Sequence, residues 1–129
     1  MIAVDTNVLV RYVTNDDPRQ SARAVALLAS DGEIFVAKTV LLEVEWVLRA
    51  VYELTAKSIH RALLHILGLP NVHAEDPGQV ALALDHYERG LDFADALHLA
   101  ANADVDTFYT FDGKFARRAR SLGEPVETL

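Results

Sequence analysis

Short segments rich in β-branched and aromatic residues alternate with longer amphipathic segments, and this alternation constrains the fold more than any other feature of the chain. Strands that alternate with helices form a parallel sheet with helices on both faces. The pattern therefore predicts an α/β protein. The expected strands are residues 1–5, 33–38, 71–75, 107–111 and 125–128, and the expected helices are residues 18–30, 40–54, 55–67, 77–89, 92–103 and 114–122.

Capping residues mark several of these helix boundaries. Thr39 is the expected N-cap of the helix 40–54, and either Thr55 or Ser58 caps the next one. Gly90 separates the helix that ends near Arg89 from the alanine-rich helix that follows.

The length and composition suit one domain over residues 1–129. The chain has no cysteine, which excludes thiolate metal sites, and no apolar run approaches the roughly 20 residues that span a bilayer. A cytoplasmic protein is therefore expected.

The net charge of −7 argues against wrapping nucleic acid by bulk electrostatics. An acidic protein can still act on nucleic acid where metal ions screen its carboxylates and its basic residues are grouped.

Four acidic residues stand where acids are uncommon. Asp5 ends the first expected strand and Asp112 follows the aromatic strand, so both are expected at the same edge of a parallel sheet. Glu43 lies inside an apolar helix, and Asp95 lies inside the alanine-rich one. Any one of them could be an ordinary cap or a paired core acid, because isolated buried acids usually have a local partner.

Together, four such carboxylates would repel one another, and a hard divalent cation removes that penalty. Mg²⁺ and Mn²⁺ prefer oxygen ligands, and such an ion can acidify a water and screen a phosphodiester. Glu45 competes with Glu43, because the two lie about 200° apart around a helix and only one can face a shared site. Asp92 shares a face with Asp95 but is as well suited to cap that helix. His98 is better suited to packing or hydrogen bonding than to binding a hard cation.

Four sequence motifs, MIAVDTNVLVRY, LLEVEWVL, DFADALHLA and TFDGKF, resemble in order the acidic motifs of PIN-domain nucleases. The likeness is strongest to the VapC-type toxins of prokaryotic toxin–antitoxin pairs, and it covers nearly the whole chain. It implies a PIN-like three-layer α/β/α sandwich with a central parallel sheet. It also implies Mg²⁺- or Mn²⁺-dependent cleavage of RNA phosphodiesters by a metal-activated water.

The resemblance implies roles for individual residues as well. The acids expected to bind the metal and to carry catalysis are Asp5, Glu43, Asp95 and Asp112. Asp92 corresponds to a position that is acidic in only some members, so it is a further candidate ligand. Thr6 and Asn7 correspond to the polar pair after the first acid, and one of them is expected to support Asp5 by hydrogen bonding. Thr110 corresponds to the Thr or Ser before the fourth acid.

Basic residues near the predicted site are expected either to guide phosphates or to contact an acidic partner, with a solvated helix face as the alternative. These residues are Arg11, Lys38, Lys114, Arg117, Arg118 and Arg120. No aromatic RNA-recognition motif is visible, so selectivity is expected to come from RNA shape and groove fit.

The helix around Trp46 is more apolar than a one-sided helix needs, which leaves core burial, a homodimer surface and an antitoxin groove open. The resemblance implies a homodimer and a VapB-type antitoxin.

The preferred hypothesis is a metal-dependent endoribonuclease that acts as the toxin of a VapBC-type pair. The alternatives are a PIN-fold RNA-processing nuclease outside a toxin pair and a non-catalytic regulatory binding module. A neighbouring antitoxin gene would favour the toxin, and metal-dependent cleavage of RNA would exclude the binding module. A flavodoxin-like receiver is a weaker fold alternative, because the Lys expected at a downstream strand end is missing.

Overall fold

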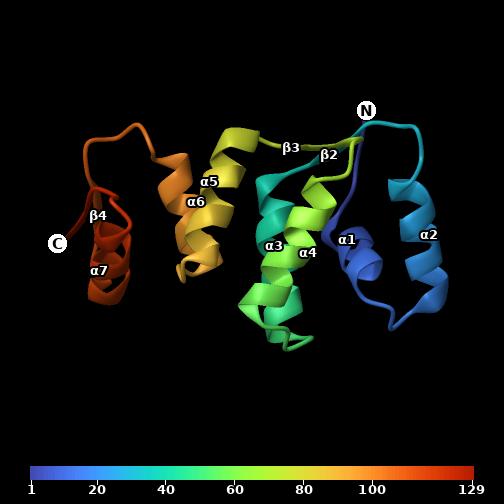
Figure 1. The fold of residues 1–129 in the computed structure, drawn as a ribbon, viewed down its shortest axis with the longest axis horizontal. Helices are drawn as coiled ribbons and strands as arrows, with labels where there is room; N and C mark the ends of the chain where they lie inside the picture. The colour runs from blue at the N-terminus through green and yellow to red at the C-terminus, as the bar shows by residue number, and fades with distance from the viewer. The chain divides into compact units, whose positions relative to one another are not determined.

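The computed structural model describes residues 1–129, which form two compact units, residues 1–77 and 78–129. The first unit contains, in chain order, β1 (Ile2–Ala3), α1 (Thr6–Val13), α2 (Pro18–Leu28), β2 (Ile34–Val36), α3 (Lys38–Ala50), α4 (Ala56–Leu67) and β3 (Val72–Ala74). The second contains α5 (Pro77–Glu88), which starts at the boundary, α6 (Phe93–Ala101), β4 (Phe108–Thr110), α7 (Gly113–Ser121) and β5 (Val126–Thr128) (Figure 1). The single domain over residues 1–129 stays a prediction.

All strand pairs in the molecule are parallel, as the alternation of strands and helices predicts. In the first unit, β2 lies between β1 and β3, with Ile34 opposite Ile2 on one side and opposite Val72 on the other. In the second unit, β4 pairs with β5, and Phe108 lies opposite Val126. The predicted α/β class is therefore confirmed, together with the strand expected at the end of the chain.

The core of the first unit is built from the apolar faces of its helices together with the buried residues Ile34 and Val36 of β2. In α4, the side chains of Ile59, Leu63 and Ile66 are fully buried. Their spacing of four and three residues aligns them on one face of a helix. Leu41 and Leu48 of α3 are likewise fully buried. These helices form because one apolar stripe of each can be removed from water.

The core of the second unit combines aromatic rings with small residues. Phe93, at the start of α6, contacts Tyr87 edge to face with 5.1 Å between ring centroids. Phe115 of α7 meets Phe108 of β4 in the same way at 5.8 Å. Such edge-to-face pairs are a favourable geometry for aromatic rings. The second pair holds the first turn of α7 against β4.

Helix α1 is an element that the sequence pattern did not predict. The expected strand 1–5 is shorter, covering only Ile2–Ala3, and the helix begins at Thr6. The Asp5 carboxylate accepts a hydrogen bond from the Val8 N–H at 3.2 Å, which makes Asp5 the N-cap of this helix. The several valines of α1 favour extended structure locally, so the cap and the tertiary packing of Leu9 and Val10 outweigh that preference.

The N-terminus of α3 also differs from the prediction. Thr39 is not its cap, because the helix starts at Lys38 and the preceding Ala37 offers no side-chain acceptor. Instead, the Glu75 carboxylate accepts the Lys38 N–H at 2.9 Å, and Lys38 Nζ lies 2.9 Å from Asp76. A contact from the end of β3 therefore satisfies this helix end. None of the helices has both the length and the apolar character needed to cross a membrane.

Candidate active site

Two of the predicted acids in the second unit are helix N-caps. Asp92 accepts a hydrogen bond from the Asp95 N–H at 3.2 Å at the start of α6. Asp112 accepts one from the Phe115 N–H at 3.0 Å at the start of α7. The Asp112 N–H in turn donates to Thr110 Oγ1 at 3.0 Å. Capping therefore fixes the positions of both carboxylates at the beginnings of two helices.

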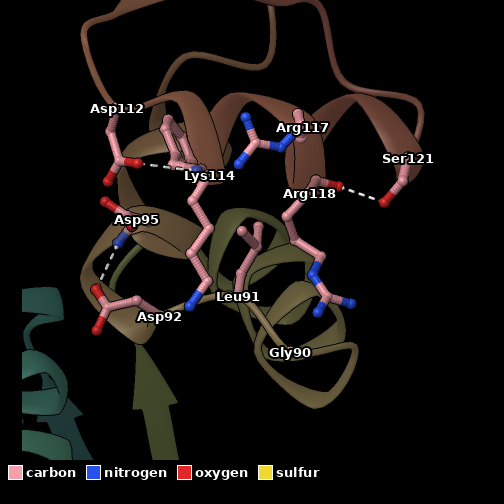
Figure 2. A pocket seen from close by; sticks show the side chains of 10 residues that line it. Gly90, Leu91, Asp92, Asp95, Asp112, Lys114, Arg117, Arg118 and Ser121 are labelled. Carbon is pink, nitrogen blue, oxygen red and sulfur yellow. Dashed lines mark hydrogen bonds between the residues drawn. The ribbon is translucent and has the colours of Figure 1, made fainter.

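A pocket of about 630 Å³ brings these acids together with basic side chains. Its lining residues are Gly90, Leu91, Asp92, Asp95, Asp112, Lys114, Phe115, Arg117, Arg118 and Ser121. Figure 2 shows the carboxylates of Asp92, Asp95 and Asp112 on one side of the pocket and the guanidinium groups of Arg117 and Arg118 on the other. A carboxylate wall facing a cationic wall is suited to a phosphate group and a hard cation together.

Asp95 is the electrostatic centre of the carboxylate wall. Partial burial raises the pKa of Asp95, and the negative charges of Asp92 and Asp112 raise it further, while His98 acts in the opposite direction. The raised pKa means that the ionised form is disfavoured where no positive charge balances it. Carboxylate oxygens are hard donors, so the three acids fit a divalent cation by their chemistry. Neither unit on its own, however, gathers three acidic or histidine side chains in the geometry of a complete metal site.

The cationic wall contains only part of the predicted basic cluster. Lys114 and Arg117 line the pocket and have no ion-pair partner in this unit. Arg118 also lines it, and its guanidinium donates to the Arg89 carbonyl at 3.4 Å. Arg120 lies outside the pocket, because its guanidinium donates to the Val126 carbonyl of β5 at 3.0 Å. The predicted contact by Arg120 is therefore not supported by its position.

In the first unit, the predicted site residues occupy the start of α1 and the middle of α3. Thr6 is buried, and its hydroxyl donates a hydrogen bond to the Glu43 carboxylate. The Thr6 hydroxyl thus contacts Glu43 and not Asp5, the acid that Thr6 or Asn7 was expected to support. Asn7 lines a separate hollow between α1 and α2, together with Val8.

Glu43 and Glu45 point to different surroundings, as their spacing on a helix predicts. Glu45 is 2% exposed and accepts hydrogen bonds from Arg49 at 2.9 and 3.3 Å. A buried carboxylate paired in this way is a structural group. Glu43 is exposed apart from its contact with Thr6. Of the two, Glu43 is therefore the acid available to a ligand.

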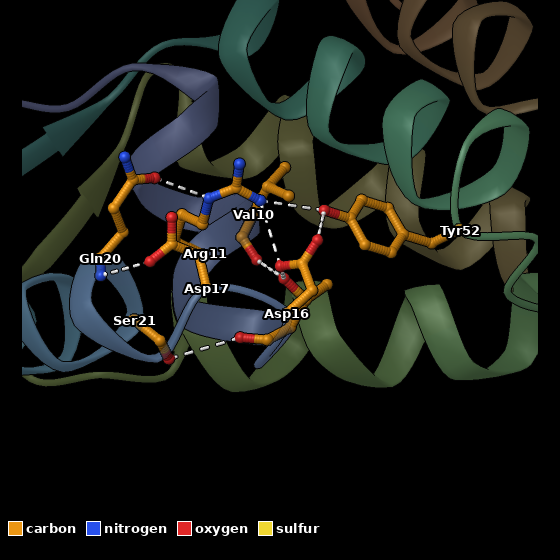
Figure 3. Close-up of polar contacts among 8 residues, drawn as sticks. Val10, Arg11, Asp16, Asp17, Gln20, Ser21 and Tyr52 are labelled. Carbon is orange, nitrogen blue, oxygen red and sulfur yellow. Dashed lines mark hydrogen bonds and ion pairs between the residues drawn. The ribbon is translucent and has the colours of Figure 1, made fainter.

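Two predicted basic contacts of the first unit are engaged within that unit. Figure 3 shows the Arg11 guanidinium donating to Gln20 at 2.7 Å, to Asp16 at 3.1 Å and to the Tyr52 hydroxyl at 3.0 Å. The hydrogen bond from Tyr52 to Asp16, at 2.6 Å, is the main cause that lowers the pKa of Asp16. The second residue, Lys38, forms the ion pair described above. Both cations therefore support the fold.

Most of the sequence matches a protein family. The matching family is described as PIN domain, and the match covers residues 2–121. The chain belongs to the PIN domain family. The predicted PIN-like α/β/α fold is thereby confirmed, with its seven helices and parallel strands.

One solved structure similar to this PIN domain is VapC20 of Mycobacterium tuberculosis, described as a Sarcin-Ricin loop cleaving toxin. The two chains share 22% identity over 96% of each, with a TM-score of 0.45. Among curated proteins, a sequence search finds no match to this chain.

Sequence reasoning missed several residues that shape the pocket of this PIN domain. Gly90 was expected only to separate two helices, yet it lines the pocket with Leu91, Phe115 and Ser121. Ser121 could have been predicted from the sequence, because it is four residues after Arg117 and three after Arg118, and residues at this spacing share a helix face. The convergence of Asp5 and Glu43 with Asp95 and Asp112 involves both units and stays a prediction.

Proposed function

We propose that this PIN domain is a metal-dependent endoribonuclease that cleaves RNA phosphodiesters. The observation that carries the proposal is the pocket of the second unit, where Asp92, Asp95 and Asp112 face Lys114, Arg117 and Arg118. A binding site for phosphate alone would need the cations only. The crowded carboxylates need a positive charge of their own, which a divalent cation would supply.

The proposed metal ligands are Asp5, Glu43, Asp95 and Asp112, with Asp92 as a further candidate. When bound, Mg²⁺ or Mn²⁺ would neutralise the phosphodiester and lower the pKa of a water molecule. Asp95 and Asp112 would hold the cation from the second unit, supported by the observed caps and by the crowding around Asp95. Thr6 would orient Glu43 through the hydrogen bond between them.

The cationic residues of the pocket have a separate task. Lys114 and Arg117 would bind the phosphate that is cleaved and offset the charge that builds up on it during the reaction. Neither side chain has an ion-pair partner in this unit, so each can engage a phosphate without first breaking another contact. The expected product ends are a 5′-phosphate and a 3′-hydroxyl, as the family resemblance implies.

Cleavage of end-labelled RNA by the purified protein tests this function. We expect cleavage with Mg²⁺ or Mn²⁺, none in excess EDTA, and a loss of at least a hundredfold in Asp95→Asn. Asp31→Asn, a change of an exposed acid in the first unit, is the matched control and should cleave as the wild type does. Undiminished cleavage in EDTA would contradict the metal requirement, and binding of RNA without any cleavage would favour the non-catalytic module.

We further propose that the protein is the toxin of a VapBC-type pair in the cytoplasm, acting as a homodimer with a VapB-type antitoxin. This part is supported by the four ordered acidic motifs. Induced expression should arrest growth, co-expression of the product of a neighbouring small gene should relieve the arrest, and Asp95→Asn should cause no arrest. Active cleavage without growth arrest would instead favour an RNA-processing nuclease.

A further inference from the structure

The pocket of the second unit extends well beyond the carboxylates. At the end away from Asp112 it is lined by Gly90, Arg118 and Ser121. Figure 2 shows the Arg118 side chain reaching from α7 toward the turn at Gly90. Residues 112 and 118 are six positions apart, which corresponds to about 9 Å along a helix axis. The pocket is therefore longer than a single phosphate group requires.

The backbone at Gly90 lies against the Arg118 guanidinium. Its φ of +103° lies in the left-handed region that favours glycine. A Cβ at this position would lie 3.4 Å from both Cζ and Nη1 of Arg118. This is ordinary van der Waals distance, so the positive φ is what favours glycine here, and the Arg118 guanidinium lies over the backbone of the turn between α5 and α6.

The charge of Arg118 is not compensated by an acidic side chain in this unit. Its one hydrogen bond from the guanidinium is the 3.4 Å contact with the Arg89 carbonyl. The Ser121 hydroxyl does not compete for a ligand of Arg118, because it donates to the Arg118 carbonyl at 2.6 Å. A guanidinium held along one edge, with its other donors open, has the planar fork that binds phosphate oxygens.

We infer that Arg118, lying over Gly90, forms a second phosphate subsite, and that the RNA strand follows α7 from the carboxylates to this turn. The inference rests on the proposed function and extends it to the length of substrate. Each nucleotide of a stacked strand advances about 3.4 Å, so about 9 Å corresponds to two or three nucleotides. Arg118 therefore contacts a phosphate two or three nucleotides from the scissile bond.

Oligoribonucleotides that share one cleavage site and grow by one nucleotide at a time, on either side, test the subsite. In the wild type, we expect kcat/KM to rise when the strand reaches Arg118 on one of the two sides. Arg118→Gln should reduce that gain about tenfold, so that its kcat/KM differs less between the shortest and the longest substrate than that of the wild type does. Arg19→Gln, which removes the same charge from an exposed position on α2, should keep the whole gain.

A binding measurement separates this inference from the proposed function. Fluorescence anisotropy of the longest oligonucleotide with metal-free Asp95→Asn protein needs no cleavage. Adding Arg118→Gln should make the slope of log affinity against log salt shallower by about 0.7, the value for one phosphate contact on a single strand. Arg118→Lys, which keeps the charge, should restore most of that slope, and thermal melts establish that each variant is folded.

An unchanged length dependence together with an unchanged salt slope in Arg118→Gln would overturn the subsite. If instead the salt slope changes as expected but the wild type never cleaves RNA, the subsite stands and the nuclease proposal fails. The subsite would also be overturned if Arg118→Lys and Arg118→Gln lost the rise in kcat/KM with oligonucleotide length equally and neither changed the salt slope. That result would assign Arg118 a structural role.

Discussion

The hydroxyl of Thr6, at the first residue of α1, donates a hydrogen bond to the carboxylate of Glu43, near the middle of α3. The two residues are far apart in sequence, and their contact joins the two helices that carry the predicted acids of the first unit. Thr6 is buried, so its hydroxyl cannot turn to bulk water when Glu43 is absent.

Replacing Thr6 by Val should lower the stability of the protein. The change keeps the side-chain shape and removes the donor, so the expected loss is about 1 kcal/mol of unfolding free energy. Urea denaturation measures this loss. Thr39→Val is the control, since Thr39 is exposed on α3 and should tolerate the change. Equal stabilities of Thr6→Val and wild type would show that the contact contributes nothing.

Replacing Asp95 by Asn should raise the stability of the metal-free protein at neutral pH. The folded pKa of Asp95 is raised, so its stabilising protonation is complete below the unfolded value of about 3.9 and is lost as pH rises through the folded pKa. The gain in stability of Asp95→Asn should therefore appear only when the pH rises above the folded pKa of Asp95. It should stay below about 1 kcal/mol, because solvent screens a partly exposed carboxylate.

Thermal melts of both proteins between pH 3 and pH 8 in EDTA follow the difference in stability. A variant that is less stable than the wild type across this range would reject repulsion around Asp95.

Adding Mg²⁺ should raise the melting temperature of the wild type more than that of Asp95→Asn. A ligand that binds only the folded state stabilises it by mass action, and the Asn variant would bind the cation more weakly. Differential scanning fluorimetry over a Mg²⁺ titration gives both shifts, with Asp31→Asn as the control. Identical shifts in all three proteins would mean that Asp95 does not contribute to cation binding.

Replacing Tyr52 by Phe should destabilise the protein more at neutral pH than in acid. The Tyr52 hydroxyl is the main cause of the lowered pKa of Asp16. A lowered folded pKa contributes stability above the unfolded value and loses it as pH falls through the folded one. The difference between Tyr52→Phe and wild type should therefore shrink below about pH 3.9. A pH series of melts tests this, and a difference independent of pH would assign the effect to packing or to the hydrogen bond from Arg11 rather than to Asp16.

Two arginines of α7 should respond differently to the same substitution. Arg117→Gln removes a charge that lines the pocket, so we expect weaker RNA binding with little change in stability. Arg120→Gln removes the hydrogen bond to Val126, so we expect a loss of about 1 kcal/mol in stability and unchanged RNA affinity per folded molecule. Anisotropy binding and urea denaturation, measured on both variants, distinguish the two effects. Weaker RNA binding by Arg120→Gln together with lower stability of Arg117→Gln would mean that Arg120, and not Arg117, contacts the RNA.

The sequence predicted what depends on local pattern. The helix that ends at Leu67 and the strand at Val126–Thr128 follow from spacing and residue type, and the structure contains both. The cap of that helix was expected at Thr55 or Ser58, and the structure has Thr55. Helix α1 was missed because its valines favour strands locally, while the cap at Asp5 and the packing of the helix decide otherwise.

The contacts between distant segments could not be predicted in the same way. The cap of α3 comes from Glu75, and the partner of Thr6 is Glu43, both far away in sequence. The difference between Arg117 and Arg120 also depends on where α7 lies against β5. A one-dimensional pattern carries the residue type at each position but not the partner that the fold brings to it.

The two caps at Asp92 and Asp112 have a consequence for how strongly a ligand can be held. Each carboxylate already has one oxygen fixed by a backbone N–H, so its rotamer is set when its helix forms. Freezing a mobile side chain opposes binding by an entropic term that can approach 2 kcal/mol for long polar residues. At these two positions the folding of α6 and α7 has already removed that freedom. The helices thus preorganise their carboxylates, and binding there depends on charge rather than on ordering the protein.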